Sequence, residues 1–346
     1  MKHGLAGVGD IAGADTLIDV RSPSEFAEDH LPGAINCPVL DDDERALIGT
    51  LYKQVSPFEA KKRGAALVAR NIARHLEAQF LDRPKHWAPI IYCWRGGQRS
   101  GSMVTIFRSI GWNARQLEGG YKAWRREVVA ELDVLPRQFR YRVLCGATGS
   151  AKSRILQAIG ALGEQIVDLE ALACHKGSVL GVLPDAPQPP QKYFETTLTT
   201  LRRLDPARPV YVEAESRKIG RLQVPDAMIE SIRAGDCLAI EAPLAARVDF
   251  LLRDYDYFLR DPAWLNTRLA ALKALRGGET VARWQAYASR GEWRTLVEEL
   301  LTGHYDPLYQ RSQERNYAGF GAPHTIAAAQ LTPAGITAAA QAIVDR

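Results

Sequence analysis

The sequence lacks both a long hydrophobic run and the features of a secretory signal. No stretch of about 18 consecutive apolar residues occurs in the chain of 346 residues, so no membrane-spanning helix is predicted. The first ten residues, MKHGLAGVGD, do not show a basic segment followed by an apolar one and a small-residue cleavage site. We therefore expect a cytoplasmic protein without a membrane partner.

The sequence also lacks closely spaced cysteines and a strong charge of either sign. Its cysteines are odd in number and far apart, with no CxxC pair, which argues against a disulfide framework and against a zinc site. The formal net charge of +4 permits an RNA partner without requiring one. We expect reduced thiols at all five positions: Cys37, Cys93, Cys145, Cys174 and Cys237.

Short apolar runs alternate with helix-like stretches in two parts of the chain, which predicts an α/β fold with parallel sheets. The first pattern fades around Pro136, and the second begins at Tyr141 with YRVLCGATGSAKSRILQAI. From about Arg247 the apolar period is mostly helical. Length and pattern together predict two domains, 1–135 and 136–346, the second with a helical C-terminal part.

The segment IIYCWRGGQRSGS ends an apolar strand on a cysteine, Cys93, and continues into glycines and arginines. Ligands bind at the carboxyl ends of strands in open α/β sheets, and the helix expected from Ser100 adds partial positive charge at its N-terminus. Glycines let backbone N–H groups point inward, and nearby cations lower a thiol pKa. The alternative is an inert buried cysteine, but the loop favours an anion-binding nucleophile, Cys93, surrounded by Trp94, Arg95, Gly96, Gly97, Gln98 and Arg99.

Cys93 and its loop, with the flanking segments LIDVRSPSEFAEDHLPGAINCPV and GWNARQLEGGYKAWR, resemble a rhodanese domain over about Leu5 to Leu135. The resemblance implies that Cys93 carries a transferable chalcogen and that the loop holds its anion. For Asp19 and Arg21 we favour another interpretation, an internal salt bridge that fixes a strand end. The matching positions are Asp19, Arg21, Glu25, His30, Pro32, Gly33, Ala34, Gly119, Gly120 and Trp124.

The segment GATGSAKS lies between an expected strand and an expected helix, as a phosphate-binding P-loop does. In such a loop backbone N–H groups bind phosphate oxygens, Lys152 neutralises them and the Ser153 hydroxyl can hold Mg²⁺. Ala151 replaces the second glycine of the pattern and adds a methyl group where the backbone passes close to phosphate. This weakens the hypothesis of ATP hydrolysis more than the hypothesis of phosphate binding. A turn that binds nothing is the alternative. The predicted diphosphate site comprises Gly146, Thr148, Gly149, Ser150, Ala151, Lys152 and Ser153.

Further charged residues follow the other apolar runs of the second half. Carboxylates at strand ends can bind Mg²⁺, and the basic residues beside them can bind a second anion. Each residue alone is more often a surface polar group, and their clustering is what supports a site. The carboxylates are Asp168, Glu170, Glu213 and Glu215, and the neighbouring residues are Ser216, Arg217, Lys218, His175, Lys176 and Ser178.

The segments CWRGGQRS, GATGSAKS, VDLEALACHKGS, QKYFE and VEAESRKIG, in this order, resemble the tRNA 2-selenouridine synthase family over nearly the whole chain. The resemblance implies a transferase that acts at the anticodon wobble position of tRNA in two steps. Geranyl diphosphate first geranylates 2-thiouridine, and selenophosphate then supplies selenium in place of sulfur. No tightly bound cofactor is expected beyond a possible Mg²⁺, and a monomer is expected.

Two other functions stay open at this stage. One is a rhodanese-type sulfurtransferase whose P-loop domain is a nucleotide-dependent regulator or kinase, and the other is a noncatalytic binding module. The RNA site is open as well, because RWQAYASRGEWR offers aromatics and arginines suited to stacking on unpaired bases, although aromatics at helical spacing are more often core. The candidates there are Trp284, Tyr287 and Trp293, with Arg283, Arg290 and Arg294.

Overall fold

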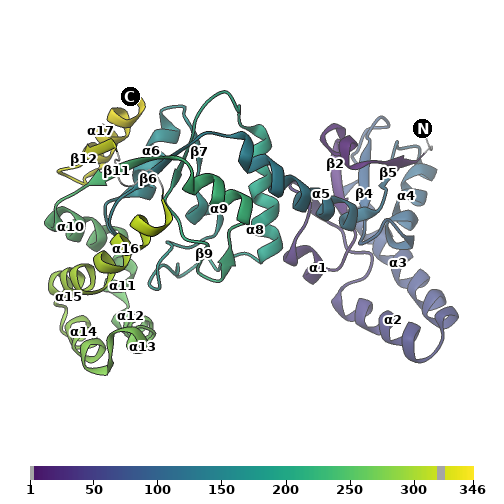
Figure 1. Cartoon of the computed structure of the whole chain (residues 1–346). Helices are drawn as coiled ribbons and strands as arrows, with labels where there is room; N and C mark the ends of the chain where they lie inside the picture. The colour runs from purple at the N-terminus through teal and green to yellow at the C-terminus, as the bar shows by residue number, and fades with distance from the viewer. Residues whose placement is uncertain (1–3, 318–323) are drawn as a thin grey trace. The chain divides into compact units, whose positions relative to one another are not determined.

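The computed structural model describes residues 4–317 and 324–346, without the side chains of residue 310 and of residues 312–315. The chain divides into two compact units (Figure 1). Unit 1 comprises Met1–Glu131 and Pro190–Thr199, and unit 2 comprises Leu132–Pro189 and Thr200–Arg346. The first stretch of unit 1 therefore ends four residues before the expected boundary at 135, and Pro190–Thr199 groups with unit 1.

Unit 1 contains a five-stranded sheet in which every pair of neighbouring strands is parallel, in the order β1-β5-β4-β2-β3. The central strand β4 is apolar and buried along its whole length, as expected for a strand covered on both faces. Ile91 pairs with Ile18 on one side and with Gln116 on the other. The strands are β1 Leu5–Ala6, β2 Thr16–Asp19, β3 Ile35–Asn36, β4 Pro89–Tyr92 and β5 Arg115–Leu117.

Helices complete unit 1, and several begin at the capping residues that the sequence provides. Asp41 accepts a hydrogen bond from the Glu44 N–H at the start of α2, and Ser56 caps α3 with proline in the first helical position. Buried side chains from α3 and α4 pack with β2 and β4 in one apolar cluster. The helices are η1 Val8–Gly13, α1 Pro23–Glu28, α2 Asp42–Gln54, α3 Pro57–Gln79, α4 Gln98–Ile110, α5 Gly120–Val134 and α8 Gln191–Leu198.

Asp19 and Arg21 form a fully buried ion pair at the end of β2. Arg21 Nη2 lies 2.6 Å from Asp19 Oδ2 and also donates to the backbone oxygen of Asp29. The guanidinium lies over the ring of Tyr121, 4.1 Å from its centroid. The interpretation of these two residues as an internal salt bridge is confirmed, and the pair fixes the chain after β2.

Helix α8 packs on unit 1 although it follows strands of unit 2 in the sequence. Thr196 Oγ1 donates to the buried carboxylate of Asp29 at 3.1 Å, and Arg125 forms an ion pair with Glu195. The ring of Tyr193 lies 4.9 Å from that of His30. These polar and aromatic contacts join residues that are far apart in the chain, and no local pattern indicates them.

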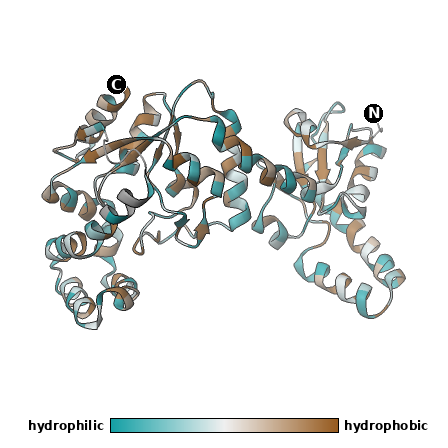
Figure 2. Cartoon of the chain, in the orientation of Figure 1, coloured by the Kyte–Doolittle hydropathy of each residue, from teal (hydrophilic) through white to brown (hydrophobic). Residues whose placement is uncertain are grey.

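Unit 2 contains a second parallel five-stranded sheet, in the order β12-β11-β6-β8-β7. Strand β6, which leads into the P-loop, is central, and the strands of both sheets are largely hydrophobic in Figure 2. The sheet strands are β6 Tyr141–Cys145, β7 Gln165–Val167, β8 Val210–Glu213, β11 Asp236–Glu241 and β12 His324–Ala327; β9 Lys218–Ile219 and β10 Leu222–Gln223 form a separate antiparallel pair.

The helices of unit 2 fall into two groups. The first packs around the sheet, and α6 and α17 contribute to its apolar cluster. The second forms a helical part with its own core, which includes Phe258, Leu265 and Trp284. The first group is α6 Lys152–Ala161, α7 Leu169–Leu172, η3 Thr199–Arg203, α9 Asp226–Arg233 and α17 Pro333–Val344, with η2 Leu135–Gln138 before the sheet. The second is α10 Leu244–Asp254, α11 Asp256–Arg260, α12 Pro262–Ala270, α13 Lys273–Arg276, α14 Gly278–Arg290, α15 Trp293–Leu300, the π-helix η4 Leu301–Tyr305 and α16 Asp306–Asn316.

The predicted α/β fold with parallel sheets and a helical part after about Arg247 is thus confirmed. The pattern did not indicate that the chain returns to the sheet after the helical part, as it does in β12. None of the described helices combines the length and the hydrophobicity needed to cross a bilayer.

Candidate active sites

Cys93 is the first residue after β4, and it is 3% exposed. The loop that follows it packs tightly against the turn before α5. Gly96 has a φ of +65°, and a Cβ there would lie 2.6 Å from the backbone oxygen of Leu117. Gly120 has a φ of +59°, and a Cβ there would lie 2.3 Å from the backbone oxygen of Cys93. Only glycine fits these two positions, so both glycine turns are needed to close the loop around the sulfur.

Two donors point at the sulfur of Cys93. The Gly97 N–H and the Ser100 hydroxyl both donate to Sγ, each at 3.2 Å. Gln116 Nε2 donates to Ser100 Oγ at 2.8 Å, so the Ser100 hydroxyl itself donates, to the sulfur and to the Gly97 backbone oxygen at 3.3 Å. Burial alone would raise the pKa of Cys93, but the hydrogen bonds from Ser100 and Gly97 and the charge of Arg99 together lower it. The loop therefore stabilises an anion on this sulfur.

The predicted loop residues differ in what they contact. Arg99 pairs with Glu25 at 2.6 Å, so its charge is partly compensated. Arg95 and Gln98 are exposed, and Trp94 is 37% exposed with its ring 5.1 Å from that of Tyr121. The cation expected from Arg95 therefore faces solvent, where it can meet an incoming anion. The sequence analysis named Ser100 only as the start of a helix and not as a donor to the sulfur. Its position in the first helical turn after the cysteine loop is the feature that could have indicated this role.

The Ser100 hydroxyl can be tested through the titration of Cys93. In Ser100→Ala the sulfur loses a donor that favours its anion, so we expect the pKa of Cys93 to rise and its alkylation to need a higher pH. The measurement is the pH dependence of iodoacetamide labelling, followed by mass spectrometry of the Cys93 peptide. Ser102→Ala is the matched control, because Ser102 lies in the same helix and donates only to the Gln98 backbone oxygen. An unchanged labelling midpoint in Ser100→Ala would contradict this assignment.

The P-loop connects β6 to α6 and contains backbone conformations that side chains rarely adopt. Gly149 has a φ of +82°, and a Cβ there would lie 2.9 Å from Leu251 Cδ1. Ala151 has a φ of +61° and is 4% exposed, and it belongs to the apolar cluster of the sheet. The non-glycine residue at this position is therefore accommodated by packing against the core, at a cost of about 1 kcal/mol for the left-handed backbone.

Lys152 turns back onto its own loop. Its Nζ donates to the Gly146 backbone oxygen at 2.7 Å and lies 5.4 Å from the centroid of the Tyr309 ring. The Tyr309 hydroxyl accepts a hydrogen bond from the Gly146 N–H. A phosphate would compete for the lysine and for this backbone N–H, which are the groups that such loops use.

Arg247 fixes the other side of the P-loop. Its Nε donates to the Thr148 backbone oxygen at 2.9 Å, and its guanidinium pairs with Asp306 at 2.6 Å. Arg247 is 7% exposed and lies in α10, so one buried side chain connects the P-loop to two helices of the helical part. Sequence reasoning did not single out this arginine, and its pattern carries no signal beyond a helical position.

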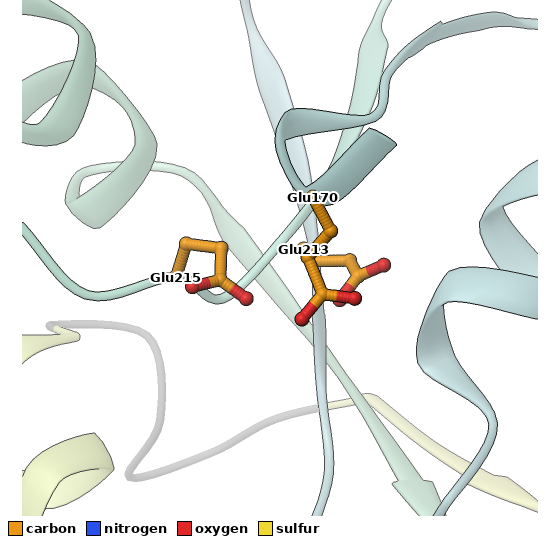
Figure 3. Close-up of side chains that lie close together, drawn as sticks. All are labelled: Glu170, Glu213 and Glu215. Carbon is orange, nitrogen blue, oxygen red and sulfur yellow. The ribbon is translucent and has the colours of Figure 1, made fainter. Parts of the chain in front are cut away.

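Three carboxylates gather beside the P-loop (Figure 3): Glu170, Glu213 and Glu215, with ligand oxygens all within 4.8 Å of one another. Ser153 Oγ donates to Glu170 at 2.9 Å, so the P-loop serine joins the cluster. Burial and the two neighbouring carboxylates raise the pKa of Glu213 well above its usual range, and burial with Glu170 raises that of Glu215 to about 8. One oxygen of Glu213 is buried without a hydrogen-bond partner. Carboxylate oxygens suit a divalent cation, which would offset the electrostatic repulsion among the three carboxylates.

Not all predicted residues of this region join the cluster. Asp168 instead accepts a hydrogen bond from the Ala171 N–H and caps α7, which places Glu170 toward the P-loop. Arg217 is exposed and pairs with Asp226. Lys176 pairs with Asp254 at 2.6 Å, and it lines the same pocket as Ser178 and the P-loop. His175 is 4% exposed and lies outside that lining.

The aromatic stretch suggested for RNA packs mainly inside the helical part. Trp284 is 2% exposed, and its Nε1 donates to Glu299, as does the Tyr287 hydroxyl. Base stacking needs an open ring face, so Trp284 cannot supply it in this conformation. The arginines of the stretch are paired with acidic side chains: Arg283 with Glu299, Arg290 with Glu292 and Arg294 with Asp249.

The carboxylate cluster predicts an unusual pH dependence of stability. A carboxylate whose pKa is higher in the folded chain than its unfolded value of about 4.3 binds more protons when folded. Stability is then lost as pH rises, here from about pH 5 to the pKa of Glu215 at about 8. We expect urea unfolding of the metal-free chain to show this loss and Mg²⁺ or Mn²⁺ to cancel most of it. Glu213→Gln should reduce both effects, and stability that rises over this range regardless of metal would contradict the assignment.

Comparison with known proteins gives the family. The sequence profile of the rhodanese-like domain matches residues 8–127. The profile of the tRNA 2-selenouridine synthase AAA domain matches residues 139–276. The tRNA 2-selenouridine synthase of Marinobacter nauticus is 33% identical over 323 residues, 85% of this chain and 87% of that one. The chain belongs to the tRNA 2-selenouridine synthase family.

Two further tRNA 2-selenouridine synthases support this assignment. That of Bdellovibrio bacteriovorus is 32% identical over 343 residues, which cover 87% of this chain and 89% of the relative. That of Nitrosomonas europaea is 38% identical over 264 residues, with coverage of 74% and 68%. Both resemblances stated from the sequence, to rhodanese domains and to this synthase family, are confirmed, and the chain is an enzyme.

Proposed function

We propose that the enzyme converts 2-thiouridine at the wobble position of tRNA to 2-selenouridine in two steps. In the first, the thiouridine sulfur attacks the allylic carbon of geranyl diphosphate, the carbon–oxygen bond breaks and diphosphate leaves. In the second, selenide released from selenophosphate attacks the carbon of the base that bears the geranylated sulfur, a carbon–selenium bond forms, the carbon–sulfur bond breaks and geranyl thiolate leaves. The observation that supports the proposal is that one chain contains both a buried cysteine whose sulfur accepts a hydrogen bond from a loop N–H and a P-loop whose lysine turns onto the loop.

The P-loop suits the first step because a leaving diphosphate gains negative charge as its bond breaks. Backbone N–H groups and Lys152 can stabilise that charge more strongly in the transition state than in the bound substrate. Glu170, Glu213 and Glu215 fit a Mg²⁺ ion, which would supply further positive charge to the diphosphate. Neither step needs ATP hydrolysis, so Ala151 in place of the second glycine is no obstacle.

The Cys93 loop suits the second step. The Gly97 N–H and the Ser100 hydroxyl stabilise negative charge at the sulfur and so favour the Cys93 thiolate. This thiolate can attack the phosphorus of selenophosphate, so that a sulfur–phosphorus bond forms, the phosphorus–selenium bond breaks and selenide leaves. Water then cleaves the sulfur–phosphorus bond, which releases phosphate and restores the thiol. Arg95 is exposed and can contact the phosphate of selenophosphate as it approaches. We therefore assign selenium transfer to Cys93, with tRNA as the partner of both steps.

Two variants separate the steps. Cys93→Ser should block selenium incorporation and leave geranylated thiouridine to accumulate, because a neutral hydroxyl attacks selenophosphate far more weakly than a thiolate does, while the P-loop is unchanged. Lys152→Ala should lower geranyl transfer by about 100-fold or more, since it removes a charge-assisted contact to the leaving group. Mass spectrometry of tRNA nucleosides after incubation with geranyl diphosphate and selenophosphate measures both products.

Matched controls are available in the same chain. Cys174→Ser alters another free cysteine, and Lys122→Ala removes an exposed lysine of α5. Both should retain both activities. Loss of geranylation in a folded Cys93→Ser variant, or full geranyl transfer by Lys152→Ala, would contradict the division of labour between the two sites.

A further inference from the structure

A second cavity in unit 2 adjoins the phosphate pocket. It is narrow, with a volume of about 70 Å³ inside a wider space of about 600 Å³ that is partly open to solvent, and its walls come from α10, α11, α12, α15 and η4. The phosphate pocket holds the P-loop residues and the three carboxylates. The two cavities adjoin each other, because they share five lining residues: Thr148, Ser178, Leu251, Tyr255 and Tyr305.

The polarity of this second cavity changes from one end to the other. All of its hydroxyl-bearing residues lie in the part shared with the phosphate pocket. The ten residues that line the second cavity alone are seven leucines with Phe258, Trp293 and Val297. A molecule that fills both cavities must therefore carry an anionic group at one end and hydrocarbon at the other.

The position of the cavity relative to the P-loop is fixed by α10. Leu251 of this helix lines both cavities and closely approaches Gly149, where an added Cβ would lie 2.9 Å from its Cδ1. One turn earlier, Arg247 holds the Thr148 backbone oxygen. The same helix thus contacts the phosphate loop and forms a wall of the apolar cavity, so one rigid element sets the distance between the two ends of a ligand.

We propose that this cavity binds the hydrocarbon chain of a prenyl diphosphate whose diphosphate lies at the P-loop. The inference rests on the proposed function and deepens it, because it assigns the selection of chain length to the helical part. An adenine ring is a poorer fit, since its nitrogens need hydrogen-bond partners and the ten deeper residues offer only the Trp293 Nε1 group. Hydrocarbon needs no such partners and gains affinity from each buried methylene.

The first test uses the unmodified enzyme and a series of ligands. Titration calorimetry with pyrophosphate, dimethylallyl diphosphate and geranyl diphosphate, in the presence of Mg²⁺, should show affinity rising with chain length. We expect geranyl diphosphate to bind at least about 10-fold more tightly than pyrophosphate. Equal affinities across the series would overturn the inference.

The second test fills the cavity. Val297 is half-buried and lines only the apolar cavity, so Val297→Trp should reduce the advantage of geranyl diphosphate over pyrophosphate to less than about 3-fold while leaving pyrophosphate affinity unchanged. Leu275→Trp is the matched control, because Leu275 is 66% exposed and lines neither cavity. If Val297→Trp does not fold, Leu259→Gln places a polar group at another half-buried position of the same wall.

The outcomes distinguish this inference from the proposed function. If the enzyme transfers geranyl to tRNA but Val297→Trp and Leu259→Gln keep the full advantage of geranyl diphosphate, the cavity is a packing gap and the inference fails alone. If the unmodified enzyme neither binds nor transfers geranyl, the proposed function fails and the inference with it. Val297→Trp could instead lower the affinity for ATP and leave the ratio of geranyl diphosphate to pyrophosphate affinity unchanged. That result would assign the cavity to a nucleotide base and would also overturn the inference.

Discussion

Both proposed sites depend on one constraint: an anion must be held at the carboxyl end of a central parallel strand. In each unit a cysteine marks that position, Cys93 at the end of β4 and Cys145 at the end of β6, and their environments differ. Cys93 receives hydrogen bonds from Gly97 and Ser100, which lower its pKa. The Cys237 thiol and burial raise the pKa of Cys145, which suits an inert core thiol. The strand end alone is therefore not a reactive site, and the donors of the following loop make the difference.

The pocket at the P-loop differs from the Cys93 loop in its electrostatics, because it contains an excess of negative charge. Three carboxylates lie within reach of one another, and Lys152 donates to the backbone oxygen of Gly146 in the P-loop. An anionic diphosphate would be repelled by this pocket unless a cation lay between it and the carboxylates. The pKa values of Glu213 and Glu215 are raised partly because these carboxylates and Glu170 repel one another. A divalent cation or bound protons would reduce this repulsion.

The sequence indicated the two strand–turn–helix sites because glycines, a lysine and a cysteine occupy local positions with a direct chemical meaning. It could not distinguish Asp168 from Glu170, since the choice depends on Asp168 capping the four-residue helix α7. The contact of α8 with Asp29 and the link from Arg247 to the P-loop involve residues far apart in the chain. The aromatics of α14 were ambiguous for another reason: helical spacing suits a core as well as an exposed stacking surface, and burial of Trp284 decides for the core.

We propose that the P-loop binds the diphosphate of an allylic substrate and does not hydrolyse a nucleotide. Quantitative measurement of the phosphate products during turnover with thiolated tRNA distinguishes these two activities. We expect one pyrophosphate released from geranyl diphosphate for each geranylated nucleoside, with no orthophosphate from added ATP. Orthophosphate release from ATP that is stimulated by tRNA and proportional to the modified product would contradict the claim.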